Sequence, residues 1–323
     1  MEIGSFIELE FQKNKEWYNG DKYNNMDVVR LNSGRAAIYH AVRCLQCSKV
    51  YLPYYQCNTV RDFLKRKGIE VAYYYIDSKF NPLINISENN TAILFVNYYG
   101  VMSETRMAVL ASKYKNVIID NSQAFFSKPI LGCMNIYSAR KFIGVPDGAY
   151  VIGEGAANFM SKYKQGYSSD TSLFLLQRIE YGCEGKAYSS RTLNENRINK
   201  EDIMKMSKLT HTILDGTDYE FIINKRQENF RYAVELFETV NLMNPLIYFS
   251  EGCIPMVYPL VVEDDELIER LQMAKHFQGH WWSYLCKELQ TDKFEYWLSR
   301  YIIPITIDQR YSKKDIERLR GLI

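Results

Sequence analysis

The chain has 323 residues, 47% of them hydrophobic, and its 40 Lys and Arg residues nearly balance 38 Asp and Glu residues to give a net charge of +2. This length can bury a large core and is typical of two domains, while the small net charge gives no reason to expect a nucleic-acid or membrane partner. No uninterrupted apolar stretch reaches roughly eighteen residues and no basic N-terminal segment precedes an apolar run, so we expect neither a membrane span nor a signal peptide.

Helix and strand patterns alternate through the first half of the chain. Apolar spacing predicts helices at 35–44, 58–67 and 104–114, and strands at 49–52, 69–76, 91–96, 117–120, 134–137 and 149–152. Ser33 is a suitable N-cap for the first helix, and Gly68 ends the second. This alternation predicts an α/β fold with a mostly parallel sheet covered by helices on both faces. The strand at 149–152 follows its predecessor without a helix, so we expect it to run antiparallel.

The second half has a different pattern. Residues 154–200 are polar and without clear periodicity, which predicts irregular structure near a subunit interface or the mouth of a site. Residues 218–239 predict a long amphipathic helix with an apolar stripe, followed by alternating strands and helices up to residue 319. We therefore predict a large domain at 1–217, and a linking helix with a small α+β domain at 218–323.

An acid and a lysine follow two of the predicted strands. Asp120 stands at the tip of the strand at 117–120, while Ser138 and Lys141 follow the strand at 134–137. Ligands of open α/β sheets bind beyond the carboxyl ends of strands. A carboxylate that keeps a pyridine nitrogen protonated and a lysine that carries an aldehyde as a Schiff base are what pyridoxal 5′-phosphate (PLP) requires. Asp120 and Lys141 are therefore the predicted catalytic pair, against the alternatives of a turn cap and a surface lysine.

A phosphate site is predicted next to this pair. The run Ser33-Gly34-Arg35-Ala36 places backbone N–H groups and the positive end of a helix together, and glycine permits close approach to a ligand. Ser138 and Arg140 add a hydroxyl and a guanidinium. The simpler alternative is that the two serines only cap a helix and a turn.

Five segments in order resemble the DegT/DnrJ/EryC1/StrS aminotransferases, a family of fold-type I PLP enzymes that often act on keto-sugars. They are residues 32–37, 50–55, 120–124, 141–149 and 302–319. The resemblance implies a seven-stranded sheet, PLP as cofactor, a homodimer and a role in sugar biosynthesis. It also implies that Gln123 touches the cofactor ring. Three features depart from the family. Arg35 stands where the family has a small threonine, Cys57 stands near a position where the family often has an aromatic residue, and Lys141 follows Ser138 by only three positions instead of the usual five.

The remaining chemistry-bearing residues carry weaker signals. Tyr55 is a candidate for stacking on the cofactor ring, with a core position as an equal alternative. The four histidines are scattered without acid-base partners, and the seven cysteines show no repeated metal-ligand spacing, so we expect no metal site. Free thiols without an export signal favour a cytoplasmic protein.

The sequence thus predicts a PLP-dependent aminotransferase. By resemblance, it would move an amino group from an amino acid, glutamate for preference, to a carbonyl substrate such as a nucleotide-linked keto-sugar. Two alternatives stay open. One is a different PLP reaction on the same fold, such as a dehydration, and the other is a dimeric relative that has lost the cofactor chemistry.

Overall fold

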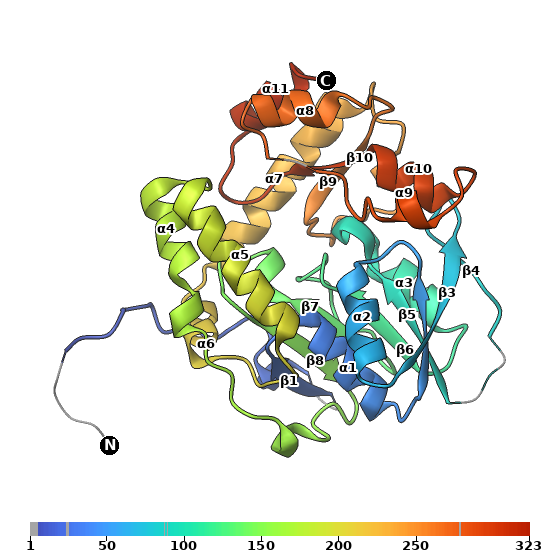
Figure 1. The fold of residues 1–323 in the computed structure, drawn as a ribbon, viewed down its shortest axis with the longest axis vertical. Coiled ribbons are helices and arrows are strands. Elements are labelled where there is room, and N and C mark those ends of the chain that lie inside the picture. The colour runs from blue at the N-terminus through green and yellow to red at the C-terminus, as the bar shows by residue number, and fades with distance from the viewer. Residues whose placement is uncertain (1–5, 24–25, 87, 89, 278) are drawn as a thin grey trace.

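The computed structural model describes residues 6–23, 26–86, 88, 90–277 and 279–323 (Figure 1). Within these residues, the large sheet has eight strands in the spatial order β1-β8-β7-β6-β5-β2-β3-β4. They are β1 (Asp27–Leu31), β2 (Lys49–Pro53), β3 (Glu70–Ile76), β4 (Pro82–Leu83), β5 (Thr91–Val96), β6 (Val117–Asn121), β7 (Met134–Ser138) and β8 (Ala149–Gly153). A small antiparallel sheet pairs β9 (Val257–Val261) with β10 (Ile302–Thr306).

The centre of the large sheet is parallel. Strands β3, β2, β5, β6 and β7 run in one direction, whereas β8 is antiparallel to β7 and β1 is antiparallel to β8. Every residue of β5, β6, β7 and β8 is buried, as expected for strands covered on both faces. The predicted α/β fold with its antiparallel strand after residue 148 is confirmed. The sequence reasoning missed β1 and the two-residue β4, and the described sheet has eight strands rather than seven.

Helices surround the large sheet and the small one (Figure 1). They are α1 (Gly34–Cys44), α2 (Asn58–Arg66), α3 (Glu104–Ala111), α4 (Leu173–Tyr181), α5 (Gly185–Lys200), α6 (Lys208–Asp215), α7 (Tyr219–Phe237), α8 (Leu267–Met273), α9 (Leu285–Glu288), α10 (Phe294–Tyr301) and α11 (Lys313–Arg320). The predicted cap of α1 is confirmed, because Ser33 Oγ accepts a hydrogen bond from the amide of Ala36 at 3.4 Å. Helix α1 buries Ala37, Ile38 and Ala41 and contacts β6, β7 and β8.

The expectation of irregular structure across residues 154–200 agrees with residues 154–172, which form turns and short 3-10 turns, but is wrong for the residues that follow. Helices α4 and α5 fill the second half of this segment and pack against each other. No residue of α4 is buried, and α5 buries only Ala187, Asn194 and Ile198. A helical hairpin that packs mainly on itself does not need the wide apolar stripe by which core helices are recognised in a sequence.

The C-terminal part of the chain joins α7 to the small sheet and to α8–α11 (Figure 1). The predicted long helix is confirmed, with Ile222, Phe230, Ala233 and Phe237 buried, but Phe221 of the predicted stripe is 54% exposed. One hydrophobic cluster contains residues from both the large sheet and the small sheet. The division at residues 217 and 218 therefore stays a prediction.

Among the described residues, no helix has the length and apolar character needed to cross a lipid bilayer. The same residues contain no group of three or more His, Cys, Asp or Glu side chains placed to hold a metal ion.

Candidate active site

The predicted acid and lysine come from two neighbouring parallel strands. Asp120 on β6 is paired in register with Ile136 on β7, so the carboxyl ends of both strands lie at the same edge of the sheet. Strand β7 ends at Ser138, and the chain then forms the 3-10 turn η3 (Ala139–Lys141). Lys141 is therefore carried to the edge where β6 ends, and its charge is close enough to lower the pKa of Asp120. The structure brings the two residues together as the sequence predicts.

Asp120 is a buried carboxylate, 7% exposed, with two hydrogen-bond donors. Its Oδ1 accepts from the backbone amide of Ser122 at 3.0 Å, and its Oδ2 accepts from Nε2 of Gln56 at 3.3 Å. Burial raises the pKa of Asp120 because it disfavours the charged form. The two donors and the charge of Lys141 oppose that shift. The carboxyl group is thus fixed in position and surrounded by groups that favour its ionised form.

Lys141 is an exposed residue, although enough of the protein lies around its ammonium group to desolvate it. Desolvation lowers the pKa of Lys141. Cys57 opposes this shift and Arg140 adds to it. A lysine that can be reached by a ligand and that loses its proton more readily than usual is suited to act as a nucleophile or a base.

The N-terminus of α1 lies against the loop that follows β6. A Cβ atom added to Gly34 would stand 3.4 Å from Oγ of Ser122, two residues beyond Asp120. The first amides of an α-helix have no intrahelical acceptor, so those of Gly34 and Arg35 are available to an anion, while the amide of Ala36 is held by the cap. The predicted phosphate-binding run and the predicted acid are therefore neighbours.

The two predicted arginines are engaged by α5. Arg140 forms an ion pair with Glu195, and an Nη1 of Arg35 donates to Oδ1 of Asn199. Burial lowers the pKa of Arg35, and the positive charge of Arg140 adds to this effect, which places the two guanidinium groups in one electrostatic environment. Among the described residues, Nε of Arg140 is buried without a hydrogen-bond partner. An anion in this environment would meet two cations, one of which has a free donor.

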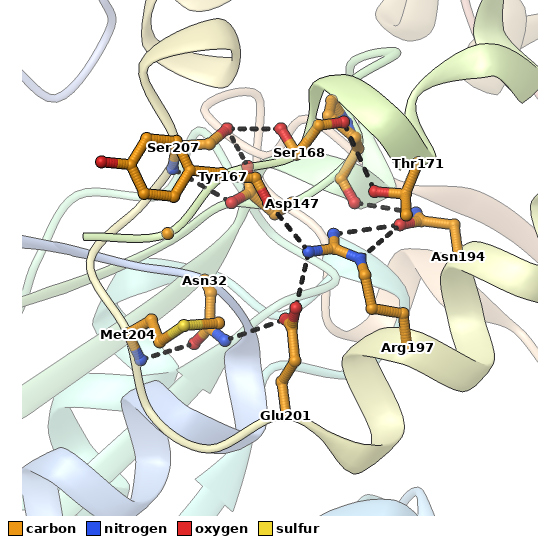
Figure 2. Close-up of polar contacts among 12 residues, drawn as sticks. Asn32, Asp147, Tyr167, Ser168, Thr171, Asn194, Arg197, Glu201, Met204 and Ser207 are labelled. Atoms are coloured by element: carbon orange, nitrogen blue, oxygen red, sulfur yellow. Dashed lines mark hydrogen bonds and ion pairs between the residues drawn. The ribbon is translucent and has the colours of Figure 1, made fainter. Parts of the chain in front are cut away.

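Figure 2 shows how α5 is held near the connection between β7 and β8. Nδ2 of Asn194 donates to the carbonyl of Pro146 at 2.9 Å, and Arg197 donates to Oδ1 of Asn194 at 3.0 Å and to the carbonyl of Tyr167 at 3.1 Å. These contacts fix the helix that carries Glu195 relative to the turn that carries Arg140.

The same network holds Met206 and Ser207 in place within their own chain. Met206 and Ser207 are 2% and 1% exposed within their own chain. The hydroxyl and the amide of Ser207 both donate to the buried carboxylate of Asp147, at 2.9 and 3.0 Å (Figure 2). The segment is therefore part of the scaffold beneath the site.

The two remaining predicted residues lie in the interior. Oε1 of Gln123 accepts a hydrogen bond from the amide of Tyr99 at 2.6 Å, so its oxygen is already used. Tyr55 is fully buried, its hydroxyl is 2.8 Å from that of Tyr99, and its ring packs edge-on against Trp282. Contact of Tyr55 with a ligand would require these neighbours to move. The position of Tyr55 agrees with the alternative that it is a core residue. Contacts of Tyr55 and Gln123 with a ligand stay predictions.

Sequence reasoning missed Gln56, Glu195 and Asn199. Gln56 lies three residues beyond the end of β2, and this position after a strand is a signal that could have drawn attention to it. Glu195 and Asn199 lie on a polar helix more than fifty residues from the segments they contact, and no local pattern marks them.

No protein-family model and no curated protein sequence matches the chain. Solved structures do match its fold. The GDP-4-keto-6-deoxy-D-mannose-3-dehydratase of Escherichia coli, with bound hydrated PLP, is 14% identical with a TM-score of 0.60, over 91% of this chain and 87% of the other. A DegT DnrJ EryC1 StrS aminotransferase of Brucella abortus is 14% identical with a TM-score of 0.59, over 91% and 84%. The sugar aminotransferase CalS13 of Micromonospora echinospora is 13% identical with a TM-score of 0.58, over 91% and 86%.

This likeness extends over nine-tenths of the chain and confirms the predicted fold, that of fold-type I PLP enzymes. The chain also contains the groups that PLP needs. Asp120 is a buried, hydrogen-bonded carboxylate, and Lys141 has a lowered pKa. Arg140, whose charge interacts with Arg35 of α1, has a buried donor without a partner among the described residues. Asp120, Lys141 and Arg140 therefore fit the ring nitrogen, the aldehyde and the phosphate of PLP, respectively.

Proposed function

We propose that this chain is a PLP-dependent aminotransferase that moves an amino group from an amino acid to the carbonyl of a nucleotide-linked keto-sugar. The observation that carries the proposal is the placement of Lys141 beside the buried carboxylate of Asp120, at the carboxyl ends of two adjacent parallel strands. The keto-sugar is favoured because proteins of this fold include a dehydratase of a GDP-linked keto-sugar and sugar aminotransferases. Glutamate as donor rests on the family resemblance.

Each residue of the site has a separate role in this reaction. PLP, when bound, supplies an electron sink for the charge that forms when the donor loses its Cα proton. Asp120 holds the proton on the pyridine nitrogen. Nζ of Lys141 takes up the Cα proton and gives it back, and its lowered pKa favours the neutral amine that this requires. The amides of Gly34 and Arg35, with Ser138 and the guanidinium groups, hold the phosphate.

One experiment separates the proposed enzyme from its two alternatives. Protein incubated with PLP should gain an absorbance band near the visible edge, and borohydride should fix the cofactor's mass on Lys141. Glutamate should then remove the band and release a keto acid. Loss of water from a keto-sugar, without net transfer of nitrogen to it, would indicate a dehydratase instead. Absence of any PLP-dependent band would favour a relative without cofactor chemistry.

The phosphate site makes a separate prediction. Arg35→Ala and Ser138→Ala should each raise the dissociation constant for PLP by about tenfold to a hundredfold, because a charge-assisted contact contributes roughly 1.5–3 kcal/mol. The absorbance maximum should stay the same, since neither side chain is assigned to the ring. Titration of cofactor-free protein with PLP measures both quantities. The exposed Arg231→Ala serves as control, and unchanged affinity in both site variants would move the phosphate elsewhere.

We also propose a homodimer, with α4 and α5 in the contact. Along α4, Leu173, Leu176 and Ile179 are 51%, 55% and 81% exposed, and they recur every third residue on one side of the helix. Leu193 of α5 is 69% exposed. Monomeric proteins rarely expose contiguous apolar surface of this kind, and paired copies are the commonest assembly. The seven free cysteines support a reducing compartment, so we place the enzyme in the cytoplasm.

Light scattering tests the assembly. Wild-type protein should have the mass of two chains, and a double substitution of Leu176→Asp with Ile179→Asp should shift it toward one chain, because two buried charges would lack partners. Leu131→Asp is the matched control, since Leu131 is 74% exposed outside this hairpin. A wild-type monomer with full activity would contradict the dimer.

A further inference from the structure

Gln56 is a buried polar side chain that lies against the carboxylate of Asp120. It is 4% exposed, and its Nε2 donates to Oδ2 of Asp120 at 3.3 Å. Its other amide atom, Oε1, is buried with no hydrogen-bond partner among the described residues. A buried acceptor without a donor costs about 1–3 kcal/mol. The side chain therefore keeps its contact with Asp120 at the expense of an unpaired oxygen.

The orientation of this amide depends on the charge of Asp120. With Nε2 toward the carboxylate, Gln56 donates to an ionised oxygen. With the amide reversed, two oxygens would face each other unless Asp120 carried a proton. The observed contact thus favours the charged form of Asp120, and it opposes the effect of burial on its pKa.

The C-terminal part of the chain holds the backbone of Gln56. The hydroxyl of Tyr284, just before α9, donates to the carbonyl of Gln56. On the other side, the amide of Gln56 donates to the carbonyl of Tyr54 at 2.9 Å. The ring of Trp282 packs against Tyr55, the residue immediately before Gln56. Trp282 and Tyr284 therefore fix the position of the segment from which Gln56 contacts Asp120.

We propose that Gln56 is a positioning residue for Asp120, which holds the carboxylate ionised and in one orientation while Tyr284 fixes Gln56 from the C-terminal part of the chain. The inference rests on the proposed function, because the carboxylate it positions is the one assigned to the ring nitrogen of PLP. It adds two residues, from the end of β2 and from the start of α9, to a site otherwise built by β6, β7 and α1.

A measurement of the Gln56 contact must separate its effect on the pKa of Asp120 from the effects of the other groups around this carboxylate. Two titratable residues, Lys141 on η3 and Tyr98 on the 3-10 turn η2 (Tyr98–Gly100), interact electrostatically with Asp120. The loop after β6 contributes the amide and the hydroxyl of Ser122. Removal of the Gln56 donor leaves these groups in place, so a change in the pKa of Asp120 would report the lost contact.

The test uses the full chain without cofactor. In Gln56→Leu, the pKa of Asp120 should rise by about one unit, since a donor to a charged acceptor is lost while burial remains. Carbon-13 NMR of labelled aspartate carboxyl groups measures it, with Asp120→Asn to assign the signal. Tyr284→Phe should produce a smaller rise in the same direction. The dissociation constant for PLP should increase about tenfold in Gln56→Leu.

Gln165→Leu is the matched control, because Gln165 is a partly buried glutamine whose Nε2 donates to the carbonyl of Met206 and not to Asp120. An unchanged Asp120 pKa in folded Gln56→Leu would overturn the inference. If that variant fails to fold, an unchanged pKa in Tyr284→Phe overturns it instead. A raised pKa in a protein that never binds PLP would support the role of Gln56 and refute the proposed function, so the two failures are distinguishable.

Discussion

Replacement of Lys141 by alanine is expected to lower the rate of transamination by at least about a thousandfold while the protein stays folded. The variant loses the group that moves the donor's Cα proton, and positioned acid-base groups contribute roughly 10²–10⁴-fold. Lys141 also retains accessible surface, so its loss leaves no cavity in the core. Release of keto acid from glutamate measures the rate, and thermal unfolding checks the fold.

Lys115→Ala is the control for this experiment, because Lys115 is exposed and lies in the turn before β6. Its activity should equal that of the wild type. Near-normal turnover in Lys141→Ala, or borohydride attachment of the cofactor to a different lysine, would show that Lys141 is not the catalytic amine. The pH profile adds a second check: the wild-type rate should rise with pH and level off below the usual lysine pKa of 10.5, because desolvation lowers the pKa of Lys141.

Replacement of Asp120 by alanine is expected to slow proton removal from the donor by roughly 10²–10³-fold or more and to weaken PLP binding. Without the carboxylate, the ring nitrogen has no partner for its proton and the cofactor accepts electrons poorly. The rate at which the Cα deuterium of a labelled donor exchanges with solvent protons measures this step directly. The exposed Asp292→Ala is the control, and equal exchange rates in Asp120→Ala and wild type would remove Asp120 from the site.

The conservative variant Asp120→Asn should separate catalysis from stability. Burial raises the pKa of Asp120 above its unfolded value, so its contribution to stability is greatest at low pH and declines as the pH rises through the folded-state pKa. At neutral pH the uncharged amide of this variant avoids the cost of burying a charged carboxylate. The side-chain amide of Gln56 can rotate so that its Oε1 accepts a hydrogen bond from the new amide. We expect a gain of roughly 0.5–2 kcal/mol in the unfolding free energy of the cofactor-free protein. Denaturant unfolding at pH 7 measures it, and a loss of stability would contradict this account.

Much of the fold could be predicted because its signals are local. The strand at 91–96 was predicted with the bounds it has in the structure, and the cap at Ser33 was read from one side chain ahead of an apolar helix. Helices α4 and α5 were missed because they pack mainly on each other, so their apolar residues do not face a core. Strand β4 was missed because a two-residue edge strand leaves no period to detect.

The candidate site divides in the same way. The sequence by itself determined that Asp120 lies at the tip of one strand and that Ser138 and Lys141 follow another, because strand tips follow from the apolar runs before them. Only the tertiary structure decided that Gln56 binds Asp120, across 64 residues, and that Glu195 binds Arg140, across 55. Such pairs depend on how elements distant in the chain pack, and packing is set by the whole core rather than by the residues on either side of a position.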